Sequence, residues 1–151
     1  MKNYEDSLKA LNKAEMAFIP HVITGLHQGE LKGELNALKM IAPYKPSALV
    51  IISFMPIPGT TMAKIVPPTS TDISRVITVA RIMFHQTPLV LGCMRPKGKH
   101  RAETDVLALK AGVNGLAFHC EEATKYAETR GYEVKFSSFC CAQIYKDLTT
   151  K

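Results

Sequence analysis

Four cysteines are the residues of this sequence best suited to metal or redox chemistry. Cys93 and Cys120 each follow an apolar segment typical of a buried strand, whereas Cys140 and Cys141 are adjacent in the chain. No C-x-x-C spacing is present, so a structural zinc site has little support. Neighbouring side chains of a strand point in opposite directions, so Cys140 and Cys141 can share a metal only across a turn. Two interpretations stay open: the four thiols are metal ligands, or they are small apolar residues without chemistry.

Three loops offer positions at which a small ligand can approach the chain. Arginine is a bidentate donor for carboxylate or phosphate, so Arg95 in the basic stretch 95–101 is a candidate substrate ligand. Gly25 has no Cβ to obstruct a planar ligand. Pro58 stiffens a second loop, and Gly59 lets that loop turn away from its strand. Each of these loops also fits an ordinary turn, so the residues alone leave both interpretations open.

The composition is that of one soluble globular domain over residues 1–151. The chain is 46% hydrophobic and 21% charged, which is ordinary for a chain that buries its own core. Prolines interrupt the apolar runs before they reach the roughly 18–20 residues of a membrane span, and the N-terminus lacks a signal-peptide core, so we expect a cytoplasmic location. The net charge is +6, but the basic residues are scattered without interleaved aromatics. This pattern disfavours nucleic acid and favours a small anionic molecule or an acidic protein.

Hydrophobic periodicity predicts helices and strands in alternation along the chain. The segment 31–42 repeats leucine at helical spacing, whereas the run 47–60 is apolar on both faces, as a covered parallel strand is. Ser70 or Thr71 is the expected cap of the third helix, and Gly112 is the residue expected to end the fourth. The predicted helices cover residues 4–15, 31–42, 72–84, 102–112 and 121–131, the predicted strands cover residues 17–26, 47–60, 88–94 and 113–120, and the tail 132–148 fits either extended or helical structure.

This α(βα)₄ order predicts an α/β fold with a parallel sheet. Two architectures satisfy the order: a small open, doubly wound sheet, or a (βα)₄ half of an eight-stranded TIM-type barrel. In both, the loops that follow the strands gather at one rim and carry the chemistry. The candidate residues are therefore expected at one rim, and they are Gly25, Pro58, Gly59, Cys93, Arg95 and Cys120.

Five segments together resemble the C-terminal half of radical SAM enzymes of the biotin synthase type. The resemblance extends to archaeal biotin-synthase-like proteins, some of which act as lipoyl synthases, and it covers residues 4–120. The segments are "PHVITGLHQGELKGELNALKMI", "ALVIISFMPIPGTTM", "RVITVARIMF", "PLVLGCMRP" and "ETDVLALKAGVNGLAF". The resemblance implies that the chain forms strands five to eight of a (βα)₈ barrel.

The family's strand-five motif, G-x-I-x-G-x-x-E, packs on the adenosine of S-adenosylmethionine. Ile23 and Gly25 match its central residues, so the resemblance implies that both contact the cofactor. The first glycine of the motif falls on His21, and its glutamate falls on Gln28, or on Glu30 with a longer loop. These two departures put the acidic partner of the cofactor in doubt.

The later segments imply further contacts. "MPIPGTTM" resembles the strand-six exit near the cofactor, which implies contacts from Pro58 and Gly59. The arginine that ligates an auxiliary iron–sulfur cluster in biotin synthases falls near Val90 and is not preserved, whereas Cys93 and Arg95 lie at the substrate end and are candidates for substrate or auxiliary-cluster contact. "KFSSFCC" is similar to the C-terminal serine motif of lipoyl synthases. The candidate ligands of an auxiliary cluster are therefore Cys93, Cys120, Cys140 and Cys141.

The C-x₃-C-x₂-C triad that holds the family's catalytic [4Fe–4S] cluster does not occur in this sequence. Three thiolates must ligate three irons so that the fourth can bind the cofactor's sulfonium. We therefore expect an N-terminal half-barrel, absent from this chain, to supply the cluster. The expected function is to contribute S-adenosylmethionine contacts and the substrate end of the site, with sulfur insertion as the family-level reaction. The alternative is a non-catalytic binding or regulatory remnant of the same fold.

Four parallel strands taken from a barrel leave two unpaired edges and an uncovered inner face. Barrel closure removes such edges. We therefore expect the chain to be an excised half, a gene fragment or the product of a split gene, and to pair with an N-terminal half-barrel polypeptide or with a second copy of itself. An unrelated flavodoxin-like binding protein is the remaining interpretation.

Overall fold

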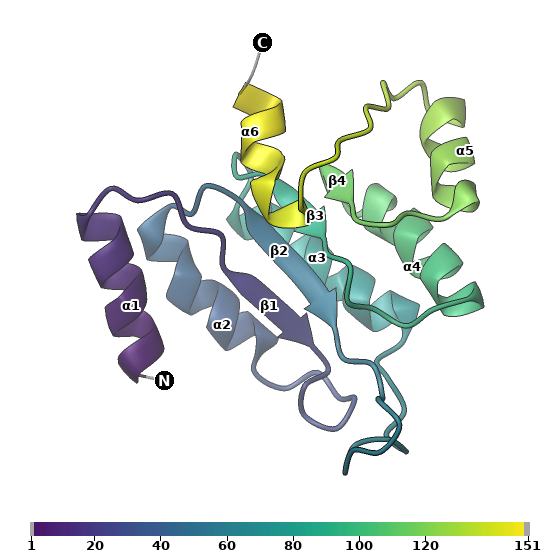
Figure 1. Ribbon diagram of the computed structural model, residues 1–151, viewed down its shortest axis with the longest axis horizontal. Helices are drawn as coiled ribbons and strands as arrows, with labels where there is room; N and C mark the ends of the chain where they lie inside the picture. Colours follow the sequence, from purple (N-terminus) through teal and green to yellow (C-terminus); the bar gives the residue numbers. More distant parts are fainter. Residues whose placement is uncertain (1, 150–151) are drawn as a thin grey trace.

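A four-stranded parallel sheet lies at the centre of the computed structural model, which describes residues 2–149 (Figure 1). The strands follow one another across the sheet in chain order, β1-β2-β3-β4, with a helix after each strand. The strands are β1 (His21–Thr24), β2 (Leu49–Ser53), β3 (Leu89–Leu91) and β4 (Gly115–Leu116), the helices are α1 (Lys2–Lys13), α2 (Glu34–Ile41), α3 (Ser70–Met83), α4 (Lys99–Lys110), α5 (Glu121–Thr129) and α6 (Ile144–Thr149), and the 3₁₀ turns are η1 (Ala42–Tyr44) and η2 (Cys141–Gln143). The predicted (βα)₄ unit with an all-parallel sheet is confirmed.

One face of the sheet forms the core with α2 and α3. Val22, Ile51 and Leu91 are in register on the three neighbouring strands, so their side chains share this face. Leu38 of α2 and Ile77 of α3 pack against them, and all five are nearly inaccessible to solvent. Apolar residues at helical spacing therefore meet apolar residues at strand spacing, and burial of this surface stabilises the unit.

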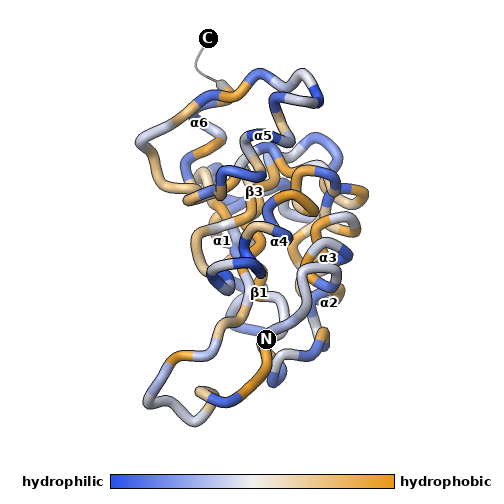
Figure 2. Tube along the Cα trace, turned by 90° about the vertical axis from the view of Figure 1, so that its right-hand side faces the viewer, coloured by the Kyte–Doolittle hydropathy of each residue, from blue (hydrophilic) through white to orange (hydrophobic). Residues whose placement is uncertain are grey.

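The opposite face, here called the open face, is covered only in part. Its strand residues alternate with the core residues, and they include Ile23, Val50 and Val90. The C-terminal segment 141–149, here called the strap, crosses this face; Figure 2 shows α6 on one side of the strands and α2 and α3 on the other. Beneath the strap, Val50 and Val90 are 0% and 2% exposed, whereas Ile23 on the edge strand is half-buried.

The observed strands are shorter than the predicted ones, several helix ends differ by two or three residues, and two of the differences have a clear local cause. Thr69, rather than Ser70 or Thr71, caps α3: its hydroxyl oxygen accepts a hydrogen bond from the Asp72 N–H at 3.1 Å. Ser70 and Thr71 already lie inside the helix, so neither can cap it. The fourth strand contains only residues 115 and 116, because Phe118 has a φ of +48° and takes the chain out of the extended conformation.

Two further predictions concern the end of α4 and the C-terminal tail. Gly112 comes directly after Ala111, the C-cap of α4, and has a φ of +92°, as predicted for a glycine that ends a helix. The tail, which the sequence left ambiguous, forms η2 and α6 after an irregular stretch. Among residues 2–149, no helix combines the length and the apolar composition needed to cross a bilayer.

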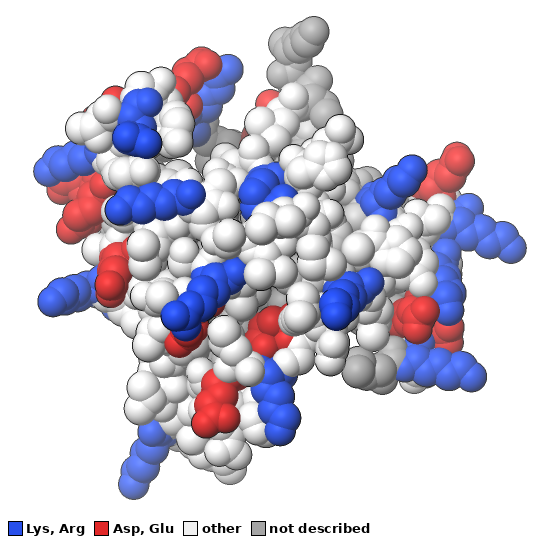
Figure 3. All heavy atoms as spheres, turned by 180° about the vertical axis from the view of Figure 1, so that it is seen from behind, with Lys and Arg blue, Asp and Glu red and all other residues white. Residues whose placement is uncertain are grey.

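The charges are distributed over the surface that the helices form. Figure 3 shows this side of the molecule, and its Lys and Arg side chains lie apart from one another, with acidic side chains among them. The excess of positive charge is therefore not gathered into one patch on this face.

Candidate functional site

The candidate residues follow the carboxyl ends of the four strands. Because all strand pairs are parallel, these ends lie along one rim of the sheet. Gly25 follows β1 directly, Pro58 and Gly59 lie in the loop after β2, and Cys93 follows β3 by two residues. Cys120 lies at the N-cap position of α5, the helix that follows β4. The loops expected to carry chemistry are thus placed along one edge of the molecule.

Gly25 at the end of β1 faces protein and not an open space. It has a φ of +73°, and a Cβ at this position would lie 2.6 Å from two ring carbons of Pro68. Its N–H donates a hydrogen bond to Glu34 Oε1 at 2.8 Å, and Glu34 is 8% exposed. The carboxylate that holds the backbone at Gly25 is therefore Glu34, a residue that the sequence analysis did not single out. The feature of the sequence that could have indicated Glu34 is its place in the first turn of a predicted helix, where the helix dipole favours an acidic residue.

The other proposed cofactor contacts are accessible. Ile23 lies on the open face and is half-buried, whereas Pro58 and Gly59 are exposed. Gly59 has a φ of +83°, and a Cβ there would meet no atom within 4 Å. The loop after β2 extends beyond the sheet in Figure 1, at the lower end of the view. These residues are free to contact a ligand, and the loop that carries two of them is held mainly at its ends.

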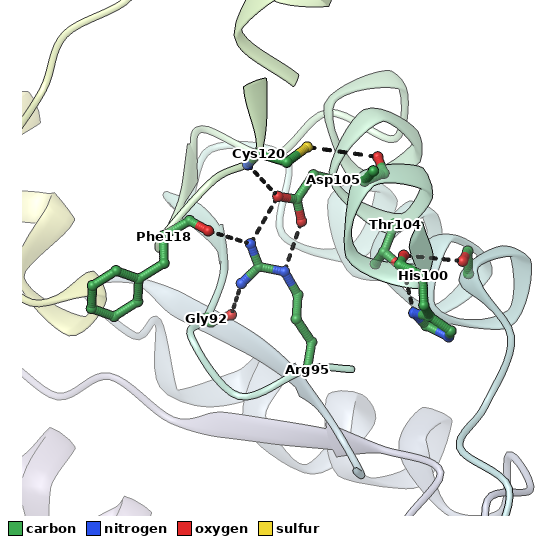
Figure 4. Close-up of polar contacts among 9 residues, drawn as sticks. Gly92, Arg95, His100, Thr104, Asp105, Phe118 and Cys120 are labelled. Atoms are coloured by element: carbon green, nitrogen blue, oxygen red, sulfur yellow. Dashed lines mark hydrogen bonds and ion pairs between the residues drawn. The ribbon is translucent and has the colours of Figure 1, made fainter. Parts of the chain in front are cut away.

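His100 connects the loop after β2 to α4. Its Nε2 lies 2.9 Å from the Pro68 carbonyl oxygen. Its Nδ1 lies 3.1 Å from Thr104 Oγ1, as Figure 4 shows. Pro68 in turn packs against Gly25. The loops after β1, β2 and β3 are therefore joined through one imidazole ring and one proline.

Arg95 is completely buried, and Asp105 of α4 neutralises its charge. Nε and Nη2 of the guanidinium donate to the two Asp105 carboxylate oxygens at 2.7 and 2.9 Å. Nη1 donates to the Gly92 carbonyl at 2.6 Å, and Nη2 also donates to the Phe118 carbonyl at 3.4 Å. Both charged side chains are 0% exposed. We call Arg95 and Asp105 the clasp, since they join β3, α4 and β4 (Figure 4).

The clasp corrects the expectation that Arg95 reaches toward a substrate. Four of the five N–H bonds of the guanidinium are directed at protein oxygens, so a substrate carboxylate would have to displace Asp105. The sequence could not reveal this partner, because the burial of Asp105 depends on how α4 packs against α3 and α5. The feature of the sequence that could have indicated a buried Asp105 is its place three residues before Ala108, on the same face of the helix; both residues are fully buried.

The clasp also fixes the exit of β4. Asp105 Oδ2 accepts a hydrogen bond from the Cys120 backbone N–H at 3.0 Å. Phe118, whose carbonyl contacts Arg95, has a left-handed φ of +48° and a side chain that is 77% exposed. A bulky residue in this conformation is strained, and such strain persists only where the surroundings enforce it. The clasp supplies that enforcement at the rim.

The four cysteines divide into two groups. The Cys120 sulfur lies 3.9 Å from the carbonyl oxygen of Ala102, and burial raises the pKa of this thiol. The Cys140 and Cys141 sulfurs lie 3.9 Å apart, because η2 supplies the turn that a shared ligand would need. The exposed Cys93 lies beside Cys141, whose sulfur accepts a hydrogen bond from the Cys93 backbone N–H. The rim thus brings together Cys93, Cys140 and Cys141.

These thiols do not form a metal centre as they are placed. Within residues 2–149, no group of three or more His, Cys, Asp or Glu side chains is arranged to hold a metal ion. Burial raises the pKa of Cys141, and the neighbouring Cys140 thiol adds to the effect, so Cys141 stays protonated at neutral pH. An auxiliary cluster on all four cysteines therefore does not fit this arrangement, and we derive no reaction step through one.

Two hollows on the surface are formed outside the open face. One, of about 550 Å³, lies at the amino ends of β1 and β2 and is lined by Met16, Phe18 and Ser47. The other, of about 240 Å³, lies between α2 and α3.

The comparisons with known proteins point to biotin synthases. The chain is 29% identical over 122 residues to the biotin synthase of Ruthia magnifica subsp. Calyptogena magnifica, and equally identical to that of Vesicomyosocius okutanii subsp. Calyptogena okutanii. Each match covers 78% of this chain but only 37% of the relative. No family model matches the chain. The findings support a distant relationship to biotin synthases, and the chain spans little more than a third of the relatives it matches.

Proposed function

We propose that this chain is the C-terminal half-barrel of a radical SAM enzyme of the biotin synthase type. In this proposal its four strands are strands five to eight of a (βα)₈ barrel. The observation that carries it is the consecutive, all-parallel order β1-β2-β3-β4 with α2 and α3 packed on one face and only the C-terminal strap on the other, together with the 122-residue match to biotin synthases. A barrel wall has this construction, because the helices that connect its strands lie outside and its other face turns toward the barrel interior.

Three residues are proposed to contact S-adenosylmethionine directly. Ile23 projects from β1 onto the open face, which would become the barrel interior. Pro58 and Gly59 are exposed in the loop after β2. Gly25 acts differently: its N–H and its left-handed backbone shape the loop beside Ile23 through Glu34 and Pro68. The contacts are apolar and backbone-based, as fits an adenosine moiety.

The substrate end of the site is proposed to lie near Cys93, at the exit of β3. Cys93 is exposed there. The Arg95 clasp holds the backbone on either side of Cys93 and so acts by positioning. Sulfur insertion is the reaction that the family resemblance suggests. The radical chemistry would come from S-adenosylmethionine and a [4Fe–4S] cluster, and this chain would orient the reactants and exclude water.

The missing components are assigned to a partner. The C-x₃-C-x₂-C triad is absent from this sequence, so the cluster would be held by an N-terminal half-barrel polypeptide. The unpaired edges of β1 and β4 are where that partner would add strands. The matched relatives extend well beyond the matched region, which leaves enough chain to complete a barrel. A second copy of this chain could close the sheet but would supply no triad.

The test is anaerobic iron–sulfur reconstitution with and without a candidate N-terminal half that carries the triad. We expect iron to bind in the mixture and S-adenosylmethionine to be cleaved to 5′-deoxyadenosine. Ile23→Asp, on the open face, should abolish cleavage while the mixture still binds iron. Ile82→Asp is the matched control, because Ile82 lies on α3 and is 72% exposed. A mixture that stays without iron and without cleavage would reject the proposal.

The second candidate is a non-catalytic binding or regulatory remnant of the same fold. The absence of the triad favours it. In that case the chain alone should bind S-adenosylmethionine or the partner, and no mixture should cleave the cofactor. Equilibrium dialysis with labelled S-adenosylmethionine, run beside the cleavage assay, separates the two candidates.

A further inference from the structure

The strap contacts the open face through Ile144 and through η2. Ile144 fills a notch in β4: a Cβ on Gly115 would lie 2.6 Å from Ile144 Cδ1. The 3₁₀ turn η2 contacts β2 and β3, where Val50 and Val90 are buried beneath it. Absence of a side chain at Gly115 is therefore what allows the strap to lie close to the sheet.

The connection to the strap is long and solvated. Residues 132–140 are exposed throughout and form neither helix nor strand. Segments with few buried contacts open locally at low free energy, without unfolding of the core. The strap can therefore leave the open face while the sheet and α2 to α4 remain folded.

Two thiols meet where the strap begins. Cys141 is the first residue of η2, and Cys93 follows the end of β3, the strand that η2 contacts. The Cys93 backbone N–H donates to the Cys141 sulfur, so Cys141 lies beside Cys93. Cys93 is exposed and open to a small reagent, whereas Cys141 is half-buried.

We propose that Cys93 and Cys141 form a reversible disulfide that locks the strap onto the open face. The oxidant is a low-molecular-weight disulfide. The Cys93 thiolate attacks one of its sulfurs and releases one thiol, and the Cys141 sulfur then displaces the second thiol from Cys93. Two electrons pass from the protein sulfurs to the reagent, and the two protons end on the two released thiols.

The lock gives the open face two states. With the disulfide formed, the strap covers Val50 and Val90 and occupies space that the barrel interior needs. With the thiols reduced, the strap can move away and leave the face to a ligand or a partner. This consequence rests on the proposed half-barrel function, whereas the disulfide itself does not.

The experiment treats the chain alone with oxidised glutathione and identifies the product by mass spectrometry after non-reducing trypsin digestion. We expect peptide 82–97, which contains Cys93, to be linked to peptide 136–146. Hydrogen exchange in α6 should slow by about tenfold and recover on reduction. A vicinal bond between Cys140 and Cys141, glutathione adducts without a cross-link, or a cross-link that leaves α6 exchange unchanged would each overturn the proposal.

Single substitutions identify the partners. Cys141→Ser should abolish the cross-link, whereas Cys140→Ser and the matched control Cys120→Ser should retain it. A cross-link that persists in Cys141→Ser would overturn the assignment. Since no cofactor or partner is present, failure here leaves the half-barrel proposal intact, and failure of cofactor cleavage leaves the disulfide intact.

Discussion

Removal of one partner of the clasp should strongly destabilise the protein. Arg95 and Asp105 are both 0% exposed, and two hydrogen bonds of 2.7 and 2.9 Å join them. Asp105→Asn leaves a buried guanidinium without a counter-charge, which costs about 3–5 kcal/mol. For a domain of this length each kcal/mol lowers Tm by about 2–4 °C, so Tm should fall by about 6–20 °C.

The assay is urea and thermal unfolding followed by circular dichroism. Arg95→Met should cost a similar free energy of unfolding, and the double variant with Asp105→Leu should cost less than the two single variants together, because no charge is left unpaired. The matched control is Arg75→Met: Arg75 pairs with Asp72 at 2.8 Å but its side chain is 70% exposed. That loss should stay below about 1 kcal/mol.

The clasp argument predicts stability loss, while a substrate role for Arg95 predicts loss of ligand binding alone. If Arg95→Met unfolds at the same urea concentration as the unsubstituted chain, the buried pair contributes nothing and the reasoning is refuted. If Asp105→Asn alone is neutral, the assignment of Asp105 as counter-charge is wrong.

Three further substitutions test other parts of the account. An alanine in the left-handed backbone conformation costs about 1–2 kcal/mol, and Gly59→Ala should lower the free energy of unfolding by only that amount. Gly25→Ala should lower it by more, because the new Cβ would also clash with the Pro68 ring. Equal losses for the two variants would contradict the packing of Pro68 against Gly25. Thr69→Ala should cost about 1 kcal/mol in urea unfolding by removal of the α3 cap, and no loss would remove Thr69 from that role. The Thr69 hydroxyl lowers the pKa of Asp72, so this carboxylate stabilises the fold at neutral pH and the contribution is lost as pH falls through its folded-state pKa. The stability difference between the unsubstituted chain and Asp72→Asn should therefore shrink as pH falls below the ordinary aspartate pKa of about 3.9, and a difference that is the same at every pH would contradict the shift.

The sheet could be predicted from the sequence because each strand is an apolar run between turn residues. The runs around β2 and β3 are apolar on both faces, and the structure buries them on both. The predicted length of the fourth strand was too great. The left-handed backbone at Phe118, which lies just beyond this strand, depends on a contact with Arg95 that no local sequence pattern encodes.

For the candidate site, the sequence predicted which loops lie at the rim but not which residues their side chains contact. Parallel order alone places Gly25, Gly59 and Cys93 along one rim. The partners of Arg95 and Cys93 could not be predicted, because tertiary packing brings Asp105 of α4 to Arg95 and Cys141 of the strap to Cys93, and no local pattern encodes that packing. From the sequence alone, an arginine in a basic stretch is expected to be exposed and to bind anions. Only the structure shows that Arg95 is buried against the Asp105 carboxylate.

The central claim, that this sheet is one wall of a barrel which another polypeptide closes, is tested most directly by sedimentation equilibrium. Under reducing conditions the chain mixed with an N-terminal half that carries the C-x₃-C-x₂-C triad should sediment as a one-to-one complex, and the chain alone should associate as its concentration rises. A chain that remains monomeric at every concentration, both alone and in the mixture, would contradict the claim.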